Sequence, residues 1–444
     1  MAQTFDATPS KYFFIEMLTR DIPLEWAILD LIDNSVDGAR DKIVGKHKDY
    51  KKPNAYKGFK VGLTLNEKEF IIKDNCGGFS KKAASDYTFK FGRPTDQSNF
   101  PKGSVGRFGV GLKRGMFKIG GYFVVETKCG KDHFFVEHDI EKWSKRTEWT
   151  FDFIDVKPGT RYPFHKPVLT EDGTYIRVTK LRETVKQDFG NPMFKKRLIE
   201  EVQRTLSYSL TNELELKIDG KKLEGKPVEL LASSALKPYF LEEKINDVTV
   251  RIYAGVGPPN PNEAGWYIFC NDRLMVEKDK SNLTGWQGDE SVKGDEQVQK
   301  FHNKVAMFRG IVFFDADRSS SLPMTTTKIG VDINSAIYKT VRSKMINAMK
   351  KVLAYLNKLE NDQQRQAIVN QSEEKDVVKL DHKKLKDEFV FPAIKKITIP
   401  EKERRITYSV DKDIYDAVRE ELNVGTAPEV GLATFNYFVE MKEL

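Results

Sequence analysis

The chain has few cysteines, no long apolar run and only a small excess of charge of one sign. Its 444 residues include three cysteines, Cys76, Cys129 and Cys270. These are too few and too widely spaced for a disulfide framework or a four-ligand zinc site. No apolar run approaches the roughly 18 residues of a membrane span, and the first residues lack the basic-then-apolar order of a signal peptide. We therefore expect a cytoplasmic protein without structural metal or a membrane partner.

Charge alone does not identify a partner. Lys and Arg number 73 and Asp and Glu 65, which gives a formal net charge of +8. Spread over this length, that excess is too small to indicate a nucleic-acid partner, so only local clusters can do so. Hydrophobic residues at 39% and charged residues at 31% are typical of a folded chain with a well-solvated surface. The length allows two to four domains.

The first long helix is predicted over residues 24–40, where apolar residues recur at helical spacing. Asp30, Asn34 and Asp37 lie at positions i, i+4 and i+7 and therefore share one face of this helix. Such a stripe is often only the solvated face of an amphipathic helix. The functional alternative is that Asn34 offers an oxygen to Mg²⁺ and that the carboxylate one turn earlier accepts a proton from water.

A second candidate element is the turn Asp74-Asn75-Cys76-Gly77-Gly78, which follows an apolar strand. Glycines let the backbone turn sharply and approach a flat ligand closely. An aspartate at the start of the turn can accept a hydrogen bond from the amino group of adenine. The alternative is a plain β-turn with Asp at its first position.

The third element is the glycine-dense stretch from Gly103 to Gly111, which is predicted to be a flexible loop running into the start of a helix. Exposed amides at a helix N-terminus bind anions, and Lys113 adds a positive charge for phosphate oxygens. The glycines also resemble the dinucleotide-binding fingerprint. That fingerprint requires a preceding strand and a first βα turn, which are missing here, so a Rossmann fold is disfavoured.

In this order, the three elements closely resemble the GHKL ATPase superfamily, which includes gyrase B, the heat-shock chaperone ATPases, MutL-type repair proteins, histidine kinases and the MORC proteins. DLIDNSVDGA resembles the Asn-bearing helix of that superfamily, DNCGG its adenine-binding turn, and GTYIRV its later Gly-Thr strand. GRFGVGLK resembles the hinge of its phosphate-binding lid and is most similar to the MORC proteins. The resemblance covers residues 15–180 with specific motifs and residues 190–345 more loosely.

The resemblance implies ATP and Mg²⁺ as cofactors and gives each motif a role. It makes Asp30 the general base, Asn34 the metal ligand, and Lys328 of the TTTKIG loop the contact to the γ-phosphate, although Lys328 can also be read as a solvated loop lysine. The implied nucleotide-binding residues are Asn34, Asp37, Asp74, Gly78, Gly106, Arg107, Phe108, Gly109, Val110, Gly111, Leu112, Lys113 and Thr174.

Two residues depart from the superfamily pattern, which usually has Glu at the position of Asp30 and Gly at that of Cys76. The change at Cys76 affects turn geometry, since both following glycines remain. The shorter Asp30 side chain sets the carboxylate back by about 1.5 Å, and a misplacement of about 1 Å can lower a rate some hundredfold. We therefore expect slow hydrolysis.

The predicted fold class is α+β. We expect a Bergerat-type α/β sandwich that binds ATP over residues 1–185, a transducer-like α/β domain over 186–345, a long helix and linker over 346–380, and a C-terminal interaction module over 381–444. The last segment, ITYSVDKD followed by two amphipathic helices, is similar to ribbon-helix-helix DNA-binding modules. From residue 406 onward, however, eight acidic residues oppose three basic ones, and phosphate neutralisation needs the opposite sign. An interaction or dimerisation module is preferred.

The sequence thus predicts an ATP-hydrolysing conformational switch that yields ADP and phosphate and closes as a homodimer clamp of GHKL or MORC type. One alternative is an ATP sensor with little hydrolysis. A protein histidine kinase is the other, disfavoured because no phosphoacceptor-histidine helix precedes the ATPase block. Non-specific DNA is a further candidate partner, because residues 42–60 carry seven lysines against the single acid Asp49. A solvated surface loop is the preferred explanation of those lysines, and any protein client is unknown.

Overall fold

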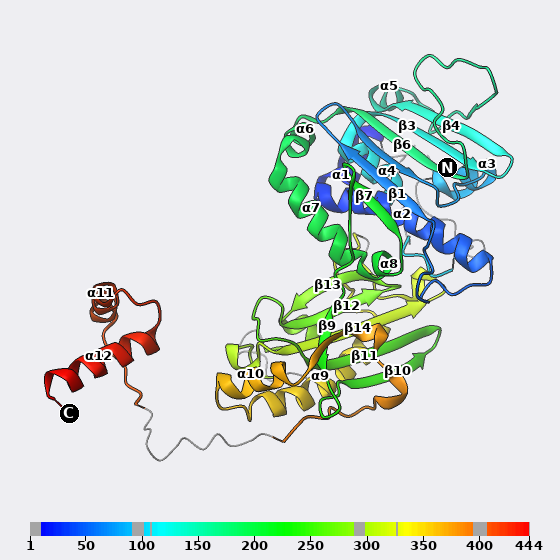
Figure 1. The fold of residues 1–444 in the computed structure, drawn as a ribbon. Coiled ribbons are helices and arrows are strands. Elements are labelled where there is room, and N and C mark those ends of the chain that lie inside the picture. The colour runs from blue at the N-terminus through cyan, green and yellow to red at the C-terminus, as the bar shows by residue number, and fades with distance from the viewer. Residues whose placement is uncertain are drawn as a thin grey trace, which may run out of the picture. The chain divides into compact units, whose positions relative to one another are not determined.

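The structure is a computed structural model that describes residues 10–90, 102–106, 109–287, 298–325, 327–393 and 406–443 (Figure 1). The chain divides into two compact units, Met1–Ile394 and Lys395–Leu444. The first unit contains both large sheets, and the described part of the second contains two helices. The α+β fold class is confirmed.

The first sheet has eight strands in the order β5-β4-β3-β6-β2-β1-β7-β8. Neighbouring strands pair antiparallel, except β1 and β7, which pair parallel. The strand bounds are β1 Lys60–Leu65, β2 Phe70–Asp74, β3 Gly120–Cys129, β4 Asp132–Asp139, β5 Ile154–Asp155, β6 Gly173–Leu181, β7 Glu215–Ile218 and β8 Lys221–Lys222. Because β2 ends at Asp74 and β6 pairs with it, the predicted turn and the Gly-Thr strand lie side by side.

Helices accompany this sheet. Their bounds are α1 Lys11–Arg20, α2 Leu24–Gly45, α3 Lys81–Ala83 followed by the π-helical turn η1 Ala84–Thr88, α4 Gly111–Ile119, α5 Ile140–Ser144, α6 Glu183–Gly190, α7 Pro192–Thr205 and α8 Ser207–Thr211. The apolar stripe of α2, including Ile28, Ile32 and Val36, shares one hydrophobic core with the strands and with α4 and α7. Burying each such side chain contributes about 1.5–3 kcal/mol. Because the apolar face of α2 is buried in the core, its other faces remain available for contacts outside the core.

The second sheet has five strands in the order β10-β11-β14-β12-β13 and packs against the long helix α9. Its bounds are β10 Tyr239–Ile245, β11 Val248–Val256, β12 Gly265–Cys270, β13 Arg273–Asp279, β14 Phe308–Ala316 and α9 Ala336–Leu356. The remaining elements are β9 Glu229–Ala232, α10 Asp362–Asn370, β15 Glu373–Asp376, α11 Lys412–Leu422, α12 Ala427–Met441 and the short 3-10 helices η2 Asn282–Thr284, η3 Asn303–Val305, η4 Ser319–Ser321, η5 Val377–Lys379 and η6 His382–Lys384.

Several local predictions hold. The Asp219-Gly220 pair predicts a two-residue turn between two strands, and the hairpin of β7 and β8 turns there, with positive φ at both residues. The glycine-dense loop runs into α4 at Gly111, and the long predicted helix is α9.

Other predictions about organisation need correction. The first sheet continues through β8, so it extends past residue 185, where we expected the first domain to end. The polar stretch after α9 is not a linker, because it forms α10 and then β15, which pairs with β9. The second unit begins at Lys395 rather than at residue 381. Residues 406–410, which the likeness to ribbon-helix-helix modules makes a strand, pair with no strand among the described residues.

Candidate functional site

A cavity of about 360 Å³ brings together every predicted site residue that the structure describes. It lies between α2, the turn after β2, the glycine-rich loop and the start of α4. Its lining includes Asp30, Asn34, Asp37, Asp74, Gly78, Gly106, Gly109, Val110, Gly111, Leu112, Lys113, Thr174 and Lys328. The predicted residues Arg107 and Phe108 lie outside the described residues. A volume of this size suits a small-molecule ligand.

Asp74 lines the cavity and is held by three donors. Its Oδ1 accepts hydrogen bonds from the backbone N–H of Cys76 at 2.8 Å and of Thr174 at 3.1 Å, and its Oδ2 accepts one from the Ser35 hydroxyl at 2.7 Å. Burial raises the pKa of this carboxyl above its ordinary value, although the three donors oppose the shift. A carboxylate oxygen has about two acceptor sites, so Oδ2 can accept one more hydrogen bond, from a ligand.

The turn after Asp74 requires glycine for steric reasons. Gly78 has φ +59°, and a Cβ there would lie 2.3 Å from the carbonyl oxygen of Lys128 and 2.7 Å from that of Gly173. Only glycine fits this approach of three backbone segments. Cys76, the departure from the superfamily pattern, is buried and lines the cavity, and burial raises the pKa of its thiol.

Asp37 holds the glycine-rich loop rather than pointing freely into the cavity. Its carboxylate accepts hydrogen bonds from the backbone N–H of Val105 at 3.1 Å and of Gly106 at 3.0 Å. The Gly106 amide, which we expected to bind phosphate, is therefore already used by a protein carboxylate. Burial is the main cause of the raised pKa of Asp37.

The same loop is also bonded to the second sheet and its flanking segment. The Asn271 side chain donates to the carbonyl oxygen of Ser104 at 3.1 Å, and the Ser319 hydroxyl donates to that of Gly106 at 3.2 Å. The Gly103 amide donates to the Asp317 carbonyl oxygen at 3.0 Å. We call the second sheet, its connecting segments and α9 the second layer of the first unit. The loop thus bridges α2 and this second layer.

Lys113 is buried, and its ammonium group contacts backbone. Nζ donates to the carbonyl oxygens of Thr88 at 2.8 Å, of Lys90 at 2.6 Å and of Gly109. We predicted a phosphate contact for Lys113. In this structure the side chain lines the cavity, and a phosphate contact requires it to leave these carbonyl groups.

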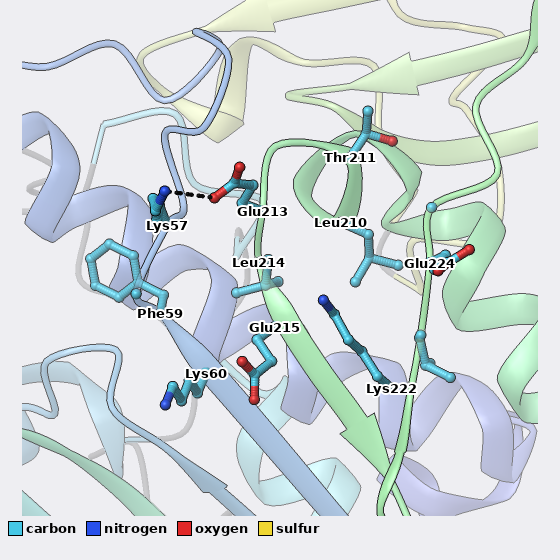
Figure 2. A pocket seen from close by; sticks show the side chains of 13 residues that line it. Lys57, Phe59, Lys60, Leu210, Thr211, Glu213, Leu214, Glu215, Lys222 and Glu224 are labelled. Carbon is cyan, nitrogen blue, oxygen red and sulfur yellow. Dashed lines mark ion pairs between the residues drawn. The ribbon is translucent and has the colours of Figure 1, made fainter.

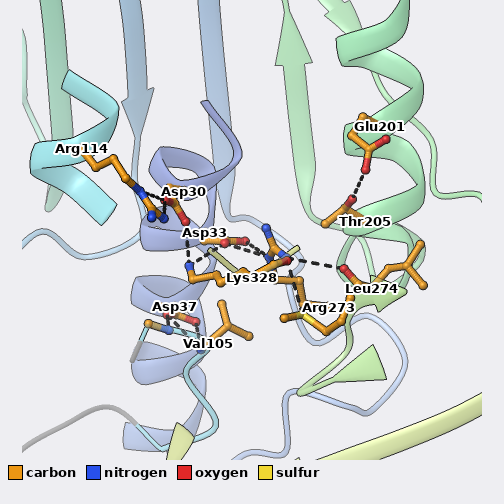
Figure 3. A network of polar contacts seen from close by, with 12 residues as sticks. Asp30, Asp33, Asp37, Val105, Arg114, Glu201, Thr205, Arg273, Leu274 and Lys328 are labelled. Atoms are coloured by element: carbon orange, nitrogen blue, oxygen red, sulfur yellow. Dashed lines mark hydrogen bonds and ion pairs between the residues drawn. The ribbon is translucent and has the colours of Figure 1, made fainter. Parts of the chain in front are cut away.

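Asp30 also lines the cavity and is paired with two cations (Figure 3). It is 1% exposed and forms an ion pair with Arg114 of α4, and its Oδ1 lies 3.1 Å from Nζ of Lys328. The start of α4 packs directly on this carboxylate, since a Cβ on Gly111 would lie 3.3 Å from Cγ of Asp30.

Asp33 extends this network into the second layer of the first unit. Nε of Arg273, at the start of β13, donates to both Asp33 oxygens, at 3.0 Å and 2.9 Å, and Nζ of Lys328 donates to Oδ2 at 2.8 Å. Arg273 also donates to the backbone carbonyl oxygen of Lys328 at 3.0 Å. Both ends of the Lys328 residue are therefore fixed.

The charges in this network stabilise one another. Burial disfavours the Lys328 ammonium, but Asp33 and Asp30 outweigh it and raise the pKa of Lys328 above its ordinary value. Burial likewise disfavours the charged form of Asp33, but Arg273 and Lys328 lower the pKa of Asp33. Removing one partner of such a buried network is expected to be costly, because it leaves an uncompensated charge.

Sequence reasoning did not find Arg114, Arg273 or Ser35. Arg114 directly follows the predicted Lys113, and Ser35 directly follows Asn34, so proximity to a motif was the only signal for either. Arg273 lies 240 residues from Asp33, and nothing local indicates that the two meet.

The lysine-rich segment 42–60 is less open than predicted. Helix α2 continues to Gly45 and so includes Lys42, which pairs with Asp172 at 3.4 Å. Lys51 pairs with Asp315 at 2.7 Å, and Lys57 with Glu213 at 3.9 Å. These acids from elsewhere in the chain offset part of the charge that suggested a DNA contact.

A second cavity of about 600 Å³ borders this segment (Figure 2). Its charged lining residues are balanced, with three lysines and three glutamates: Lys57, Lys60, Lys222, Glu213, Glu215 and Glu224. A balanced lining does not favour an anionic ligand such as a phosphate backbone.

Residues 22–166 match the sequence profile of the family described as histidine kinase-, DNA gyrase B- and HSP90-like ATPase. The match includes α2, the turn after Asp74, the glycine-rich loop and α4, and it supports the GHKL superfamily for this part of the chain. It suggests ATP binding. It ends before Thr174 and Lys328. No curated protein matches the chain.

Two further observations concern metal and membrane. Within the described ranges, no group of three or more His, Cys, Asp or Glu side chains is arranged to hold a metal ion. None of the helices in the described part of the chain combines the length and apolar character needed to cross a bilayer.

Proposed function

We propose that the chain is an ATP-binding, Mg²⁺-dependent conformational switch that hydrolyses ATP slowly to ADP and phosphate. One observation carries this proposal. A single cavity joins Asp74, suited to adenine, to Asp30 and Lys328, suited to water and the γ-phosphate. Lys328 belongs to the second layer, 295 residues after Asp33, so the state of the ligand is connected to the position of that layer.

The residues present fit an adenine nucleotide with its cation. Asp74 accepts a hydrogen bond from the adenine amino group. Thr174 lies next to Asp74, because its backbone N–H donates to the Asp74 carboxylate. Asn34 is the exposed residue in the middle of the α2 face that lines the cavity, and its amide oxygen would hold Mg²⁺. The cation supplies charge neutralisation of the triphosphate.

The proposed chemistry depends on release of Asp30. Both carboxylate oxygens of Asp30 contact a cation, Oδ2 the Arg114 guanidinium and Oδ1 the Lys328 ammonium, so the departure of Lys328 is what frees Oδ1 to face an attacking water. A γ-phosphate competes for Lys328 and draws it away from Asp30 and Asp33. Asp30 then accepts a proton from the attacking water as Lys328 neutralises the phosphate.

This exchange of partners couples the reaction to movement. When Lys328 turns to the nucleotide, Asp33 keeps only Arg273, so the contact between α2 and the second layer changes. By the resemblance to GHKL and MORC proteins, ATP then favours a closed homodimer that opens after hydrolysis, with DNA or a protein client as the partner acted upon.

A second candidate function is an ATP sensor with little hydrolysis. The observation that favours it is the pairing of Asp30 with two cations, together with the shorter side chain of Asp relative to Glu. In that case ATP shifts the conformation by binding alone. Nucleotide binding and turnover, measured together, distinguish the two functions.

The test measures nucleotide binding and turnover in the full chain. We expect Mg²⁺-ATP at about 100 times its Kd to add about 2.7 kcal/mol of stability. Asp74→Asn is expected to abolish most of this gain, because its amide donates where adenine also donates. Asp387→Asn, at an exposed position outside the cavity, is the matched control. No thermal shift and no calorimetric binding at millimolar nucleotide would refute the proposal. Binding without turnover, with or without DNA, would favour the sensor.

A further inference from the structure

Gly103, the first residue of the glycine-rich loop, is held from three sides. Its carbonyl oxygen accepts a hydrogen bond from the Arg40 guanidinium of α2 at 3.2 Å. Its amide donates to the carbonyl oxygen of Asp317, just beyond β14, at 3.0 Å. The Tyr50 ring lies against the third side, since a Cβ on Gly103 would lie 2.8 Å from Cε1 of that ring. Gly103 has φ +73°, so only glycine suits both this conformation and this close approach.

Arg40 connects Tyr50 to this residue of the loop. The Arg40 guanidinium lies 5.0 Å from the centre of the Tyr50 ring, a distance at which a cation is attracted to an aromatic face. The same guanidinium donates to the Tyr56 hydroxyl at 2.8 Å. Both tyrosines belong to the lysine-rich segment 42–60, and both are buried. A displacement of this segment is therefore expected to move Gly103.

Lys51 ties the same segment to the second layer. It directly follows Tyr50, and its Nζ lies 2.7 Å from Oδ1 of Asp315 in β14. Oδ2 of Asp315 accepts a hydrogen bond from Arg251 of β11 at 2.9 Å. Burial disfavours the charged form of Asp315, but Lys51 and Arg251 outweigh it and lower the pKa of this carboxyl. Asp315 is therefore a charged partner for Lys51 at neutral pH.

The contacts to the segment and to the loop meet at the end of β14. Asp315 contacts Lys51, and Asp317, two residues later, accepts the bond from the Gly103 amide. Ser104, the residue after Gly103, lines the ligand cavity. The position of this strand end therefore determines the position of one part of the cavity wall.

We propose that the Lys51–Asp315 ion pair is a latch through which the second layer positions the glycine-rich loop beside the ligand cavity. Tyr50 and Arg40 act as positioning residues that transmit the state of the latch to Gly103. When the second layer moves, Lys51 leaves Asp315, Tyr50 shifts from Gly103, and the loop opens. This regulation rests on the proposed function, because the position of the loop affects a nucleotide only if the cavity binds one.

The first experiment measures amide hydrogen exchange in the full chain without nucleotide. Lys51→Met removes the ammonium group, while Asp315 keeps Arg251 as its partner. We expect exchange in residues 103–106 to become about 5-fold faster, the factor that a partly exposed ion pair contributes. The matched control is Lys52→Met, at the next lysine, which is exposed and forms no ion pair with a described residue. Exchange in α9 should not change in either variant, which excludes a general loss of stability. Unchanged exchange in residues 103–106 of Lys51→Met overturns the proposal.

A double substitution tests whether Lys51 acts through Asp315. Asp315→Asn alone should also speed exchange in residues 103–106, and its amide oxygen can still accept a hydrogen bond from Arg251. In the Asp315→Asn background, Lys51→Met should have no further effect. The same effect in both backgrounds overturns the latch.

Lys51→Arg decides the same question if Asp315→Asn does not fold. Arginine retains the positive charge and can pair with a carboxylate. Exchange equal to that of the parent chain supports the latch, and exchange equal to that of Lys51→Met overturns it.

The second experiment measures the dissociation of a fluorescent ATP analogue in the presence of Mg²⁺. We expect dissociation to be faster in Lys51→Met by about the same 5-fold factor and unchanged in Lys52→Met. Faster exchange in the loop with unchanged dissociation would overturn the role of the latch in retaining nucleotide. If the parent chain binds no analogue, the proposed function is refuted, whereas the exchange measurements still decide whether Lys51 positions the loop.

Discussion

The proposed role of Asp30 as general base depends on its ion-pair partners as much as on its position in α2. It occupies the helix position at which the resemblance places the general base, yet in this structure it contacts Arg114 and Lys328. Its availability as a base depends on the lysine moving to the nucleotide.

We expect Asp30→Asn to reduce turnover by about 10²–10⁴-fold and to preserve nucleotide binding, because a positioned base contributes a factor of that size. Asp30→Glu is expected to retain or raise the rate of hydrolysis, because its longer side chain brings the carboxylate closer to the attacking water. Single-turnover hydrolysis and ATP-induced thermal shift measure the two effects separately. Turnover in Asp30→Asn equal to that of the parent would show that another group supplies the base.

At the scale of elements, the short polar strand β15 ends in a buried carboxylate. Its last residue, Asp376, is 3% exposed, and its Oδ2 has no hydrogen-bond partner among the described residues. Burial raises the pKa of Asp376 to about 6, although the Val378 amide opposes the shift. The carboxylate is therefore a source of instability at neutral pH.

This residue predicts a pH dependence. The unfolded chain releases the Asp376 proton near pH 4 and the folded chain near pH 6, so stability falls as pH rises between these values. Two pKa units correspond to roughly 3 kcal/mol. Asp376→Asn is expected to stabilise the protein by up to that amount at pH 8 and to have little effect at pH 4, as measured by denaturant unfolding. Asp387→Asn, at an exposed residue nearby, is the control. Equal effects at both pH values would contradict this explanation.

Local signals predicted some elements and not others. Helix α2, the loop into α4 and the hairpin at Asp219 have signals that lie within a few residues of one another. The α10–β15 region lacks such a signal because its sequence is polar. Gln364 and Arg365 of α10 are nevertheless buried, where they form hydrogen bonds with the chain around Leu359 and Glu360. The strand β15 in turn pairs with β9, and no pattern within a few residues indicates a partner that distant in sequence.

At the scale of the whole molecule, the candidate site depends on residues that are distant in sequence. The residues on α2, in the Asp74 turn and in the glycine-rich loop could be assigned from motifs, and the structure places the described ones around one cavity. Arg114 and Arg273 could not be assigned, because ion pairs across 84 and 240 residues leave no local pattern. Motifs therefore predicted the residues that line the cavity, but not the arginines that pair with its aspartates.

Lys328 is expected to transmit the nucleotide state to the second layer. Lys328→Ala should preserve ADP binding and remove the difference between ATP and ADP in closure, measured by limited proteolysis or by small-angle scattering. Lys339→Ala, at an exposed position on α9, is the control. Because the substitution leaves Asp30 and Asp33 short of a cation, stability must be measured in parallel. ATP-dependent closure and hydrolysis that both survive in Lys328→Ala would show that the lysine has no sensing role.

The loop at residues 103–106 has a kinetic consequence. Its backbone is bonded to Asp37 of α2 on one side and to Asn271, Asp317 and Ser319 on the other. Displacement of the loop breaks bonds to both layers in the same event. The escape of a ligand past this loop and the relative motion of the two layers are therefore expected to cross one common barrier, with a single relaxation time.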